Sequence, residues 1–280
     1  MYRSLFIVLA ASLLAGCATS PQYSHKQPIV HAAADEPQDA VKVRGVHIGV
    51  GVTFGNQDCP GAVMDAETCK GWLDGKTTTL LLNNAATVQN VKDAIAQSAQ
   101  GMTERDLLVV TVSGHGTQRQ DLSGDEADWK DEGAVLYDRT WWDDEVWEFV
   151  LTLPPCRILL ISDTCHSEGS WRRVLRAATF GMLDGRKYVQ VEMDLGDARS
   201  ATWGGQLIQI AGCRESGYSY GSEKEGGTLT QTLDKHLSGA ESVQDWFDKT
   251  HAAVVRYGRQ EPVLSTYNAS EMFLRGRVFE

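Results

Sequence analysis

The chain has 280 residues, 42% of them hydrophobic, and its 37 Asp and Glu residues against 26 Lys and Arg residues give a formal charge of −11 at pH 7. This length and composition suit one large or two small globular domains with a sizeable core. The acidic balance, without a basic stripe, argues against nucleic acid as a partner, because polyphosphate binding depends on clustered Lys and Arg side chains.

The N-terminus has the pattern of an export signal. After Arg3, residues 5–15 form an almost unbroken apolar run, too short for a spanning helix of about 20 residues. The run ends in Leu-Ala-Gly-Cys at residues 14–17, which resembles the lipobox of bacterial lipoproteins. We expect residues 1–16 to be a signal peptide and Cys17 to be lipidated. The alternative is an ordinary signal peptide with a cysteine near its cleavage site.

The lipobox resemblance implies an exported protein that its lipid anchors to the membrane of the bacterial cell envelope. Ala18, rather than Asp, after the cysteine implies the periplasmic face of the outer membrane. Residues 18–40 lack apolar periodicity and are rich in Ala, Pro, Gln, Ser and Asp, which predicts that residues 17–40 form a disordered tether. Residues 41–280 show no internal repeat and are predicted to form one domain.

Short apolar runs alternate with longer helical patterns along this domain. Strands are predicted at residues 43–50, 77–82, 107–112, 157–161 and 207–211. Helices are predicted at residues 62–73, 88–97 with Thr87 as N-cap, 143–150, 229–237 and 243–257. Runs such as LLVVTV and RILLI are typical of parallel strands buried between helices. The pattern predicts an α/β fold with a mostly parallel central sheet.

Two of the predicted strands run directly into residues that carry chemistry. LLVVTV continues into SGHG at residues 113–116, and RILLI continues into SDTC at residues 162–165. Ligands bind beyond the carboxyl ends of strands in open parallel sheets, so neighbouring strands would bring His115 and Cys165 to one cleft. A cysteine attacks carbonyl carbon well when an imidazole takes its proton. This pair is the candidate catalytic dyad.

The cysteine count is consistent with a free thiol. Five cysteines remain besides Cys17, and an odd number cannot all pair in disulfides. Cys59 and Cys69 could pair with each other outside the cytoplasm. Cys156 precedes one predicted strand and Cys213 follows another, so parallel neighbours would hold these two at opposite edges of the sheet.

An ordered series of motifs resembles the metacaspase branch of the caspase-like cysteine peptidases. His115 lies in SGHG and Cys165 in DxCxS, 50 residues apart, whereas the caspase signature QACxG is absent. Other matching segments are GAVMDA at 61–66, the acidic insert at 114–132, DDE at 143–145, AGCRE at 211–215, GTLTQ at 227–231 and QEP at 260–262. The resemblance spans about residues 43–266 and implies a caspase-like, three-layer αβα sandwich.

The resemblance also implies roles in a cysteine endopeptidase. Cys165 would be the nucleophile, His115 the general acid/base, and the backbone N–H groups of Gly116 and Cys165 would receive the oxyanion, with no cofactor in the chemistry. His166, beside the nucleophile, is interpreted as structural.

A substrate pocket follows from the same resemblance. Asp65 and Asp163, with Ser113, would form an acidic pocket for the residue before the scissile bond. The substrates would be proteins or peptides with Arg or Lys there. The alternative is that the two Asp residues cap helices or form salt bridges.

Metacaspases commonly depend on calcium, and the matching ligands here are Asp131, Asp143 and Asp144. The fourth ligand of that family is an Asp after the nucleophile, where this chain has EGSWRR at 168–173. Arginine there would repel a cation, so calcium is an activator only as a hypothesis. The acidic run 121–132 lacks the EF-hand spacing, and a solvated loop explains it equally well.

Residues 168–204 lack a clear strand and contain several basic residues, so we predict limited self-cleavage there. Two other functions stay open. The fold could be a catalytically silent, lipid-anchored binding or scaffold protein, because function resides in the site and not in the fold. A calcium-responsive lipoprotein is the second, and the missing fourth acid weakens it.

Overall fold

The computed structural model describes residues 27–31, 40–53, 58–121, 129–165, 177–183, 186–192, 203–214, 217–256, 258 and 260–280. The predicted signal peptide, Cys17, most of the tether, His166 and the segment EGSWRR lie outside the described residues. Within the described part of the chain, no helix is long and apolar enough to cross a membrane.

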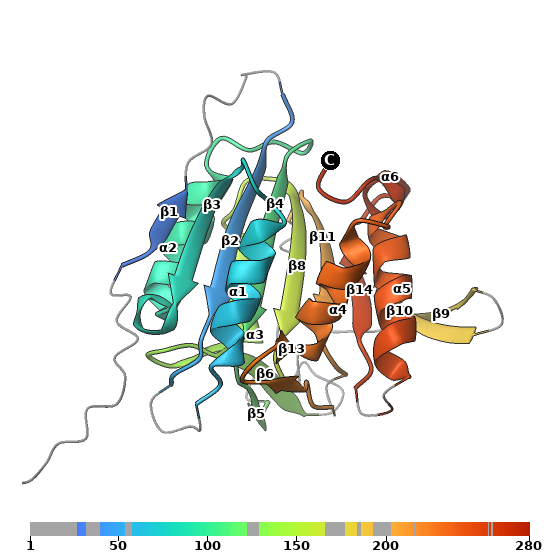
Figure 1. Ribbon diagram of the computed structural model, residues 1–280. Coiled ribbons are helices and arrows are strands. Elements are labelled where there is room, and N and C mark those ends of the chain that lie inside the picture. The colour runs from blue at the N-terminus through green and yellow to red at the C-terminus, as the bar shows by residue number, and fades with distance from the viewer. Residues whose placement is uncertain are drawn as a thin grey trace, which may run out of the picture.

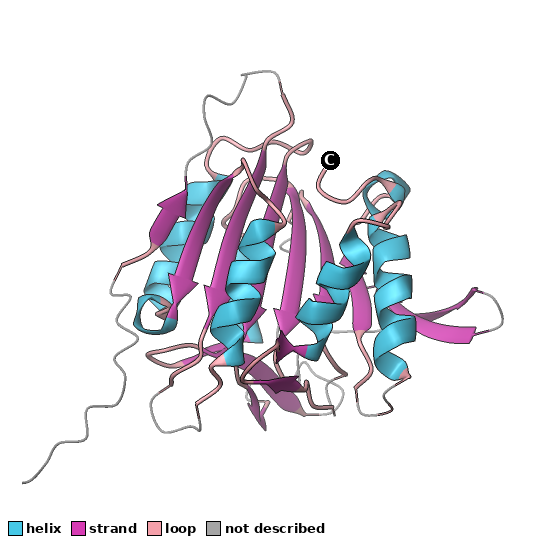
Figure 2. Ribbon diagram, viewed as in Figure 1, coloured by secondary structure: helices cyan, strands magenta, loops and turns pink. Residues whose placement is uncertain are grey.

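A nine-stranded mixed sheet forms the centre of the fold, in the order β1-β3-β2-β4-β8-β11-β14-β10-β9 (Figures 1 and 2). Its strands are β1 (Ile29–His31), β2 (Val43–Gly49), β3 (Thr77–Leu82), β4 (Leu107–Ser113), β8 (Arg157–Asp163), β9 (Ala177–Leu183), β10 (Arg186–Glu192), β11 (Gln206–Ala211) and β14 (Val263–Tyr267). The five consecutive strands from β3 to β11 are parallel to one another. The predicted α/β fold with a mostly parallel centre is confirmed.

Helices cover both faces of this sheet, which gives three layers. They are α1 (Gly61–Gly71), α2 (Val88–Ala99), α3 (Asp143–Val150), α4 (Thr228–Leu237), α5 (Val243–Val255) and α6 (Glu271–Arg275). In Figure 1, α1, α4 and α5 lie in front of the sheet and α2 and α3 behind it. Thr87 caps α2 as predicted, because its side chain accepts from the Asn90 N–H at 3.2 Å.

The apolar runs form central strands because both of their faces are buried. Along β4, Leu108, Val110 and Val112 belong to the core cluster that includes α2 and α3 side chains. Leu107 and Val109 belong to the cluster on the other face, which includes Trp246 of α5. Residues on both faces of such a strand pack against helices, so the whole strand has to be apolar. A continuous apolar run in the sequence therefore indicates a central strand.

Two small sheets lie at the carboxyl ends of the central strands (Figure 1). One contains β5 (Gly116–Gln120), β6 (Lys130–Val135) and β7 (Thr140–Trp142), and the other contains β12 (Gly221–Ser222) and β13 (Gly226–Gly227). They place short polar segments beside the strand ends that carry SGHG and SDTC.

Three expectations from the sequence are corrected. Residues 29–31 of the predicted tether form β1, which pairs antiparallel with β3. Residues 168–204 were expected to lack a clear strand, but they contain β9 and β10, which pair with each other, and β10 also pairs with β14. Backbone pairing with a neighbouring strand defines these elements.

The third correction concerns a disulfide. Cys59 and Cys69 are separate thiols, one just before α1 and the other in its last turn. Ten residues along a helix correspond to about 15 Å, far beyond the span of a disulfide.

Candidate active site

The register between β4 and β8 brings the two candidate catalytic residues to one end of the sheet. Ser113 is paired with Asp163, so His115 and Cys165 each follow two residues beyond the same paired position. Both side chains are partly exposed. The parallel pairing that the sequence only suggested therefore places His115 and Cys165 at the same edge.

Gly116 lies directly against the backbone of Cys165. A Cβ atom at Gly116 would come within 1.8 Å of the Cys165 carbonyl oxygen, so no side chain fits there. The Val135 N–H donates to the His115 carbonyl, which makes Gly116 and Ala134 a non-hydrogen-bonded pair of the β5–β6 ladder. The Gly116 N–H therefore stays outside the β5–β6 ladder.

The thiol of Cys165 contacts the returning chain after β11. Its Sγ donates to the carbonyl oxygen of Ser219 at 3.7 Å. Burial raises the pKa of the Cys165 thiol above its ordinary value. The protonated thiol therefore dominates at neutral pH, so attack on a carbonyl requires a base that takes the proton.

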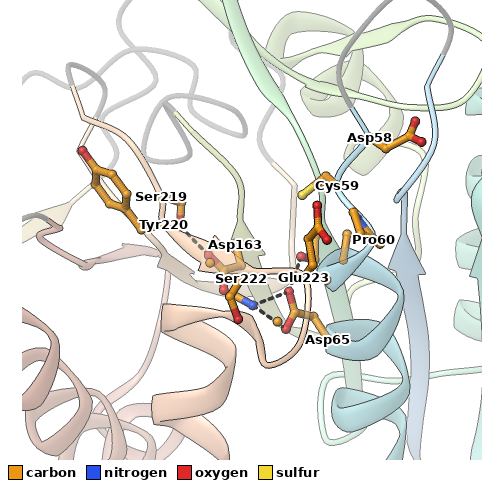
Figure 3. A pocket seen from close by; sticks show the side chains of 16 residues that line it. Asp58, Cys59, Pro60, Asp65, Asp163, Ser219, Tyr220, Ser222 and Glu223 are labelled. Carbon is orange, nitrogen blue, oxygen red and sulfur yellow. Dashed lines mark hydrogen bonds between the residues drawn. The ribbon is translucent and has the colours of Figure 1, made fainter.

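A cavity of about 210 Å³ has four acidic side chains in its wall. Its lining also includes Ser219, whose carbonyl oxygen accepts from Cys165 Sγ. In Figure 3, Asp58 lies highest and Asp65 lowest of the four in the view, with Asp163 and Glu223 between them. Asp65 and Asp163 are 1% and 5% exposed, whereas Asp58 and Glu223 are exposed. The structure thus brings Asp65, Asp163 and Ser113, all predicted as pocket residues, into one cavity.

Asp65, in the second turn of α1, is held by three donors. The Ser113 hydroxyl donates to Oδ2 at 2.6 Å. The Gly227 N–H donates to Oδ1 at 2.8 Å and to Oδ2 at 3.0 Å. The side chain of Gln231 also hydrogen bonds to this carboxylate. Asp65 points into the cavity and does not cap α1, whose N-cap is Pro60 without a side-chain hydrogen bond.

Asp163 is held by Ser219 and by the first turn of α4. Its Oδ2 accepts from the backbone N–H and the hydroxyl of Thr230, each at 3.0 Å, and its Oδ1 accepts from the Ser219 hydroxyl. The Thr230 N–H belongs to the first turn of α4, where backbone donors point outward. Asp163 therefore also accepts from a backbone N–H at the N-terminus of α4. This agrees with the alternative prediction, in which the two Asp residues cap helices.

The two buried carboxylates are costly to ionise together. Burial, followed by the charge of Asp163, raises the pKa of Asp65 to about 7. Burial also raises the pKa of Asp163. A cation in the cavity would favour ionisation of both groups, because a nearby opposite charge stabilises the charged form of a carboxyl group.

The Gly226-Gly227 step leaves room for these carboxylates. A Cβ atom at Gly227 would lie 2.1 Å from Asp163 Oδ2, and one at Gly226 would lie 2.2 Å from Asp65 Oδ1. Gly226 also has a φ of +83°, which L-residues rarely adopt. The backbone of β13 therefore forms part of the cavity wall.

The predicted calcium ligands do not form a metal site in the described residues. Asp131 is buried, and its Oδ2 accepts from both Nε and Nη2 of Arg119 at 2.7 Å. The same guanidinium stacks over Trp142 at 4.1 Å from the ring centroid. In the part of the chain that is described, no group of three or more His, Cys, Asp or Glu side chains is arranged to hold a metal ion. Arg119 already neutralises Asp131, so this arrangement does not fit calcium there.

Sequence reasoning missed several residues of the cavity. Ser219 and Tyr220 lie in a polar loop without a motif, and Cys59 was considered only as a disulfide partner. Gln260 bonds to both Ser219 and the Tyr220 backbone. Among Ser219, Tyr220, Cys59 and Gln260, only Gln260 lies in a segment that the sequence analysis had singled out, QEP at 260–262.

Comparison with known proteins identifies the family. A family described as "Caspase domain" matches residues 47–274. Metacaspase-1 of Arabidopsis thaliana is 28% identical over 212 residues, covering 66% of this chain and 55% of that protein, so the chain spans about half of its relative's length.

Solved structures agree on the fold. Protein GSU0716 from Geobacter sulfurreducens superposes with a TM-score of 0.62 at 24% identity, over 85% of this chain and 98% of that one. Caspase-1 from Spodoptera frugiperda gives a TM-score of 0.50 at 13% identity, over 86% of this chain and 95% of that one.

Proposed function

The chain belongs to the caspase-domain family and is metacaspase-like, and from this premise we propose that it is a cysteine endopeptidase that cleaves after Arg or Lys. One observation carries the specificity. Two buried carboxylates, Asp65 and Asp163, line a cavity that Ser219 connects to the candidate nucleophile, because the Ser219 carbonyl accepts from Cys165 Sγ.

In the proposed mechanism, His115 takes the thiol proton as Cys165 Sγ attacks the scissile carbonyl carbon. The N–H groups of Gly116 and Cys165 stabilise the oxyanion. When the C–N bond breaks, the imidazolium returns the proton to the leaving amine. Water then attacks the thioester with His115 as base, which releases the new carboxyl terminus and restores the thiol.

The cavity selects the substrate by charge. A guanidinium or ammonium group between Asp65 and Asp163 replaces the repulsion of two buried carboxylates with attraction. A neutral substrate would leave that repulsion in place, and an acidic one would increase it. The rim residues Asp58 and Glu223 add attraction for a cation as it approaches.

Export, Cys17 lipidation and attachment to the outer membrane are part of the same proposal, and they rest on the N-terminal pattern LAGC. The catalytic steps involve no metal. A test of the lipid is the mass of the protein recovered from membranes, which should exceed the unmodified mass in wild type but not in Cys17→Ala.

The peptidase activity is tested by hydrolysis of fluorogenic Arg peptides by the purified full chain. Wild type should cleave them, whereas Cys165→Ala and His115→Ala should lose at least about a thousandfold in rate. Cys156→Ala, at the opposite end of β8, should keep the wild-type rate. A folded wild-type protein without turnover would favour the scaffold function instead.

A further inference from the structure

Gln260, just before β14, hydrogen bonds to Gly212 and to two residues that line the cavity, Ser219 and Tyr220. Its Nε2 donates to the Gly212 carbonyl at 2.8 Å and to the Ser219 hydroxyl at 3.0 Å. Its Oε1 accepts from the Tyr220 N–H at 3.0 Å. A backbone carbonyl only accepts and a backbone N–H only donates, so these partners fix the orientation of the amide.

Ser219 connects Gln260 to the two parts of the site. Its carbonyl oxygen accepts from Cys165 Sγ, and its hydroxyl donates to Asp163 Oδ1. A hydroxyl has one proton, and Gln260 donates to the Ser219 oxygen. That donation leaves the hydroxyl proton directed at Asp163.

The surroundings give Ser219 little freedom. A Cβ atom at Gly212 would lie 2.6 Å from Ser219 Oγ and 3.1 Å from Asp163 Oδ1. Gly212, which directly follows β11, is therefore packed against both side chains. Gln260 itself is 6% exposed. A buried amide with both ends engaged is a rigid support, because leaving its partners unsatisfied is costly.

We propose that Gln260 is a positioning residue that fixes Ser219 and Tyr220, and through Ser219 keeps Asp163 ready to bind a cation beside Cys165. This inference rests on the proposed function, in which Asp163 binds the basic side chain. Gln260 does not touch the reacting atoms, and its effect should appear in substrate binding and in the pH dependence.

Gln260→Met tests this, because methionine has a similar volume and lacks both the C=O acceptor and the NH2 donor of the side-chain amide. Without the oriented Ser219 donor, the ionised form of Asp163 is less favoured. We expect KM for an Arg peptide to rise about tenfold, with kcat changed less than threefold, and the acid limb of kcat/KM to move to higher pH. In a Ser219→Ala background, Gln260→Met should raise KM less than it does in wild type, because the Ser219 hydroxyl is already absent. Only the hydrogen bond to the Tyr220 N–H is then left to lose.

The neighbouring Glu261→Gln is the matched control. Glu261 is exposed and pairs with Arg214 at 2.6 Å. It should keep the wild-type KM and pH profile. Equal changes in the two variants, or a loss in kcat alone with unchanged KM and pH limb, would overturn the positioning role.

Two readouts without turnover separate this inference from the proposed function. Benzamidine, an amidinium cation, should bind the full chain carrying Cys165→Ala, and about tenfold more weakly when Gln260→Met is added. If wild type neither cleaves Arg peptides nor supports benzamidine binding, the proposed function fails. The rate of Cys165 alkylation by iodoacetamide, compared between wild type and Gln260→Met, then decides the role of Gln260, because Gln260 holds Ser219 and the Ser219 carbonyl accepts from the thiol. A difference of threefold or more supports the positioning role, and equal rates overturn it.

Discussion

Asp65 and Asp163 line the same cavity, and Gly227 lies against both carboxylates. The Gly227 N–H donates to Asp65, while its Cα leaves no room for a side chain against Asp163. One carboxylate comes from α1 and the other from the end of β8, nearly a hundred residues later. The fold thus concentrates negative charge in a buried place, an arrangement that costs stability and suits a cationic ligand.

The cost of this arrangement predicts how stability depends on pH. The pKa of Asp65 is raised to about 7, so between its ordinary value and pH 7 the folded state holds a proton that the unfolded state has lost. Stability should therefore fall as pH rises through this range. Asp65→Asn should be more stable than wild type at pH 8, by on the order of 2 kcal/mol, and equally stable at pH 4.

Denaturant unfolding at the two pH values measures this difference. Asparagine keeps one acceptor oxygen for the Gly227 N–H, and the Ser113 hydroxyl and the Gln231 amide can reorient to accept from its NH2 group, so the main change is the loss of the charge. The same variant should lose most hydrolysis of Arg peptides. A variant less stable than wild type at pH 8 would contradict the raised pKa of Asp65.

The tight contact at Gly227 predicts a loss of substrate binding on adding one methyl group. The φ of Gly227 is −76°, which alanine adopts readily, so Gly227→Ala acts through its Cβ atom against Asp163. We expect kcat/KM for Arg peptides to fall at least about tenfold. Gly239→Ala is the control, because its Cβ meets no atom within 4 Å, and it should keep full activity. Equal rates in the two variants would show that the Gly227 contact has no role.

The Arg119–Asp131 pair predicts independence from calcium. Peptidase rates with added calcium and with chelator should be the same, because Arg119 already supplies the positive charge at Asp131. Arg119→Ala should lower stability by about 1–3 kcal/mol, since Asp131 is 3% exposed and would lose its partner. Arg139→Ala, which removes a solvent-exposed pair with Glu145, should change stability by less than about 0.5 kcal/mol. A calcium-dependent rate in wild type would refute this prediction.

Self-cleavage within residues 168–204 is expected from the basic residues of that segment. Intact mass after incubation should show fragments ending in Arg or Lys for wild type and a single mass for Cys165→Ala. The same fragments in both proteins would indicate a different protease.

The sequence predicted those parts of the fold in which burial dictates composition. β4 and β8 were recognisable because both faces meet helices, and the dyad was recognisable because SGHG and SDTC follow those strands directly. The short edge strand β1 was missed because backbone pairing with β3 stabilises it without an apolar run. β9 and β10 were missed as well, and the structure pairs them with each other and β10 with β14.

Within the site, the sequence indicated residues of unusual type or motif and missed those that act through geometry. Asp65 and Asp163 came from the family resemblance. Ser219 is an ordinary serine in a loop, and only the return of the chain after β11 brings it to Asp163. Arg119 was not connected with Asp131, because their contact depends on the pairing of β5 with β6.

The most direct test of the account compares two peptides that differ only in charge, one with Arg and one with citrulline before the scissile bond. Citrulline has nearly the shape of Arg but is neutral, so it tests the buried carboxylates and not the size of the cavity. The account predicts that the full chain cleaves the Arg peptide at least about a hundredfold faster, and that Cys165→Ala cleaves neither. Equal cleavage of the two peptides would contradict a pocket built on Asp65 and Asp163.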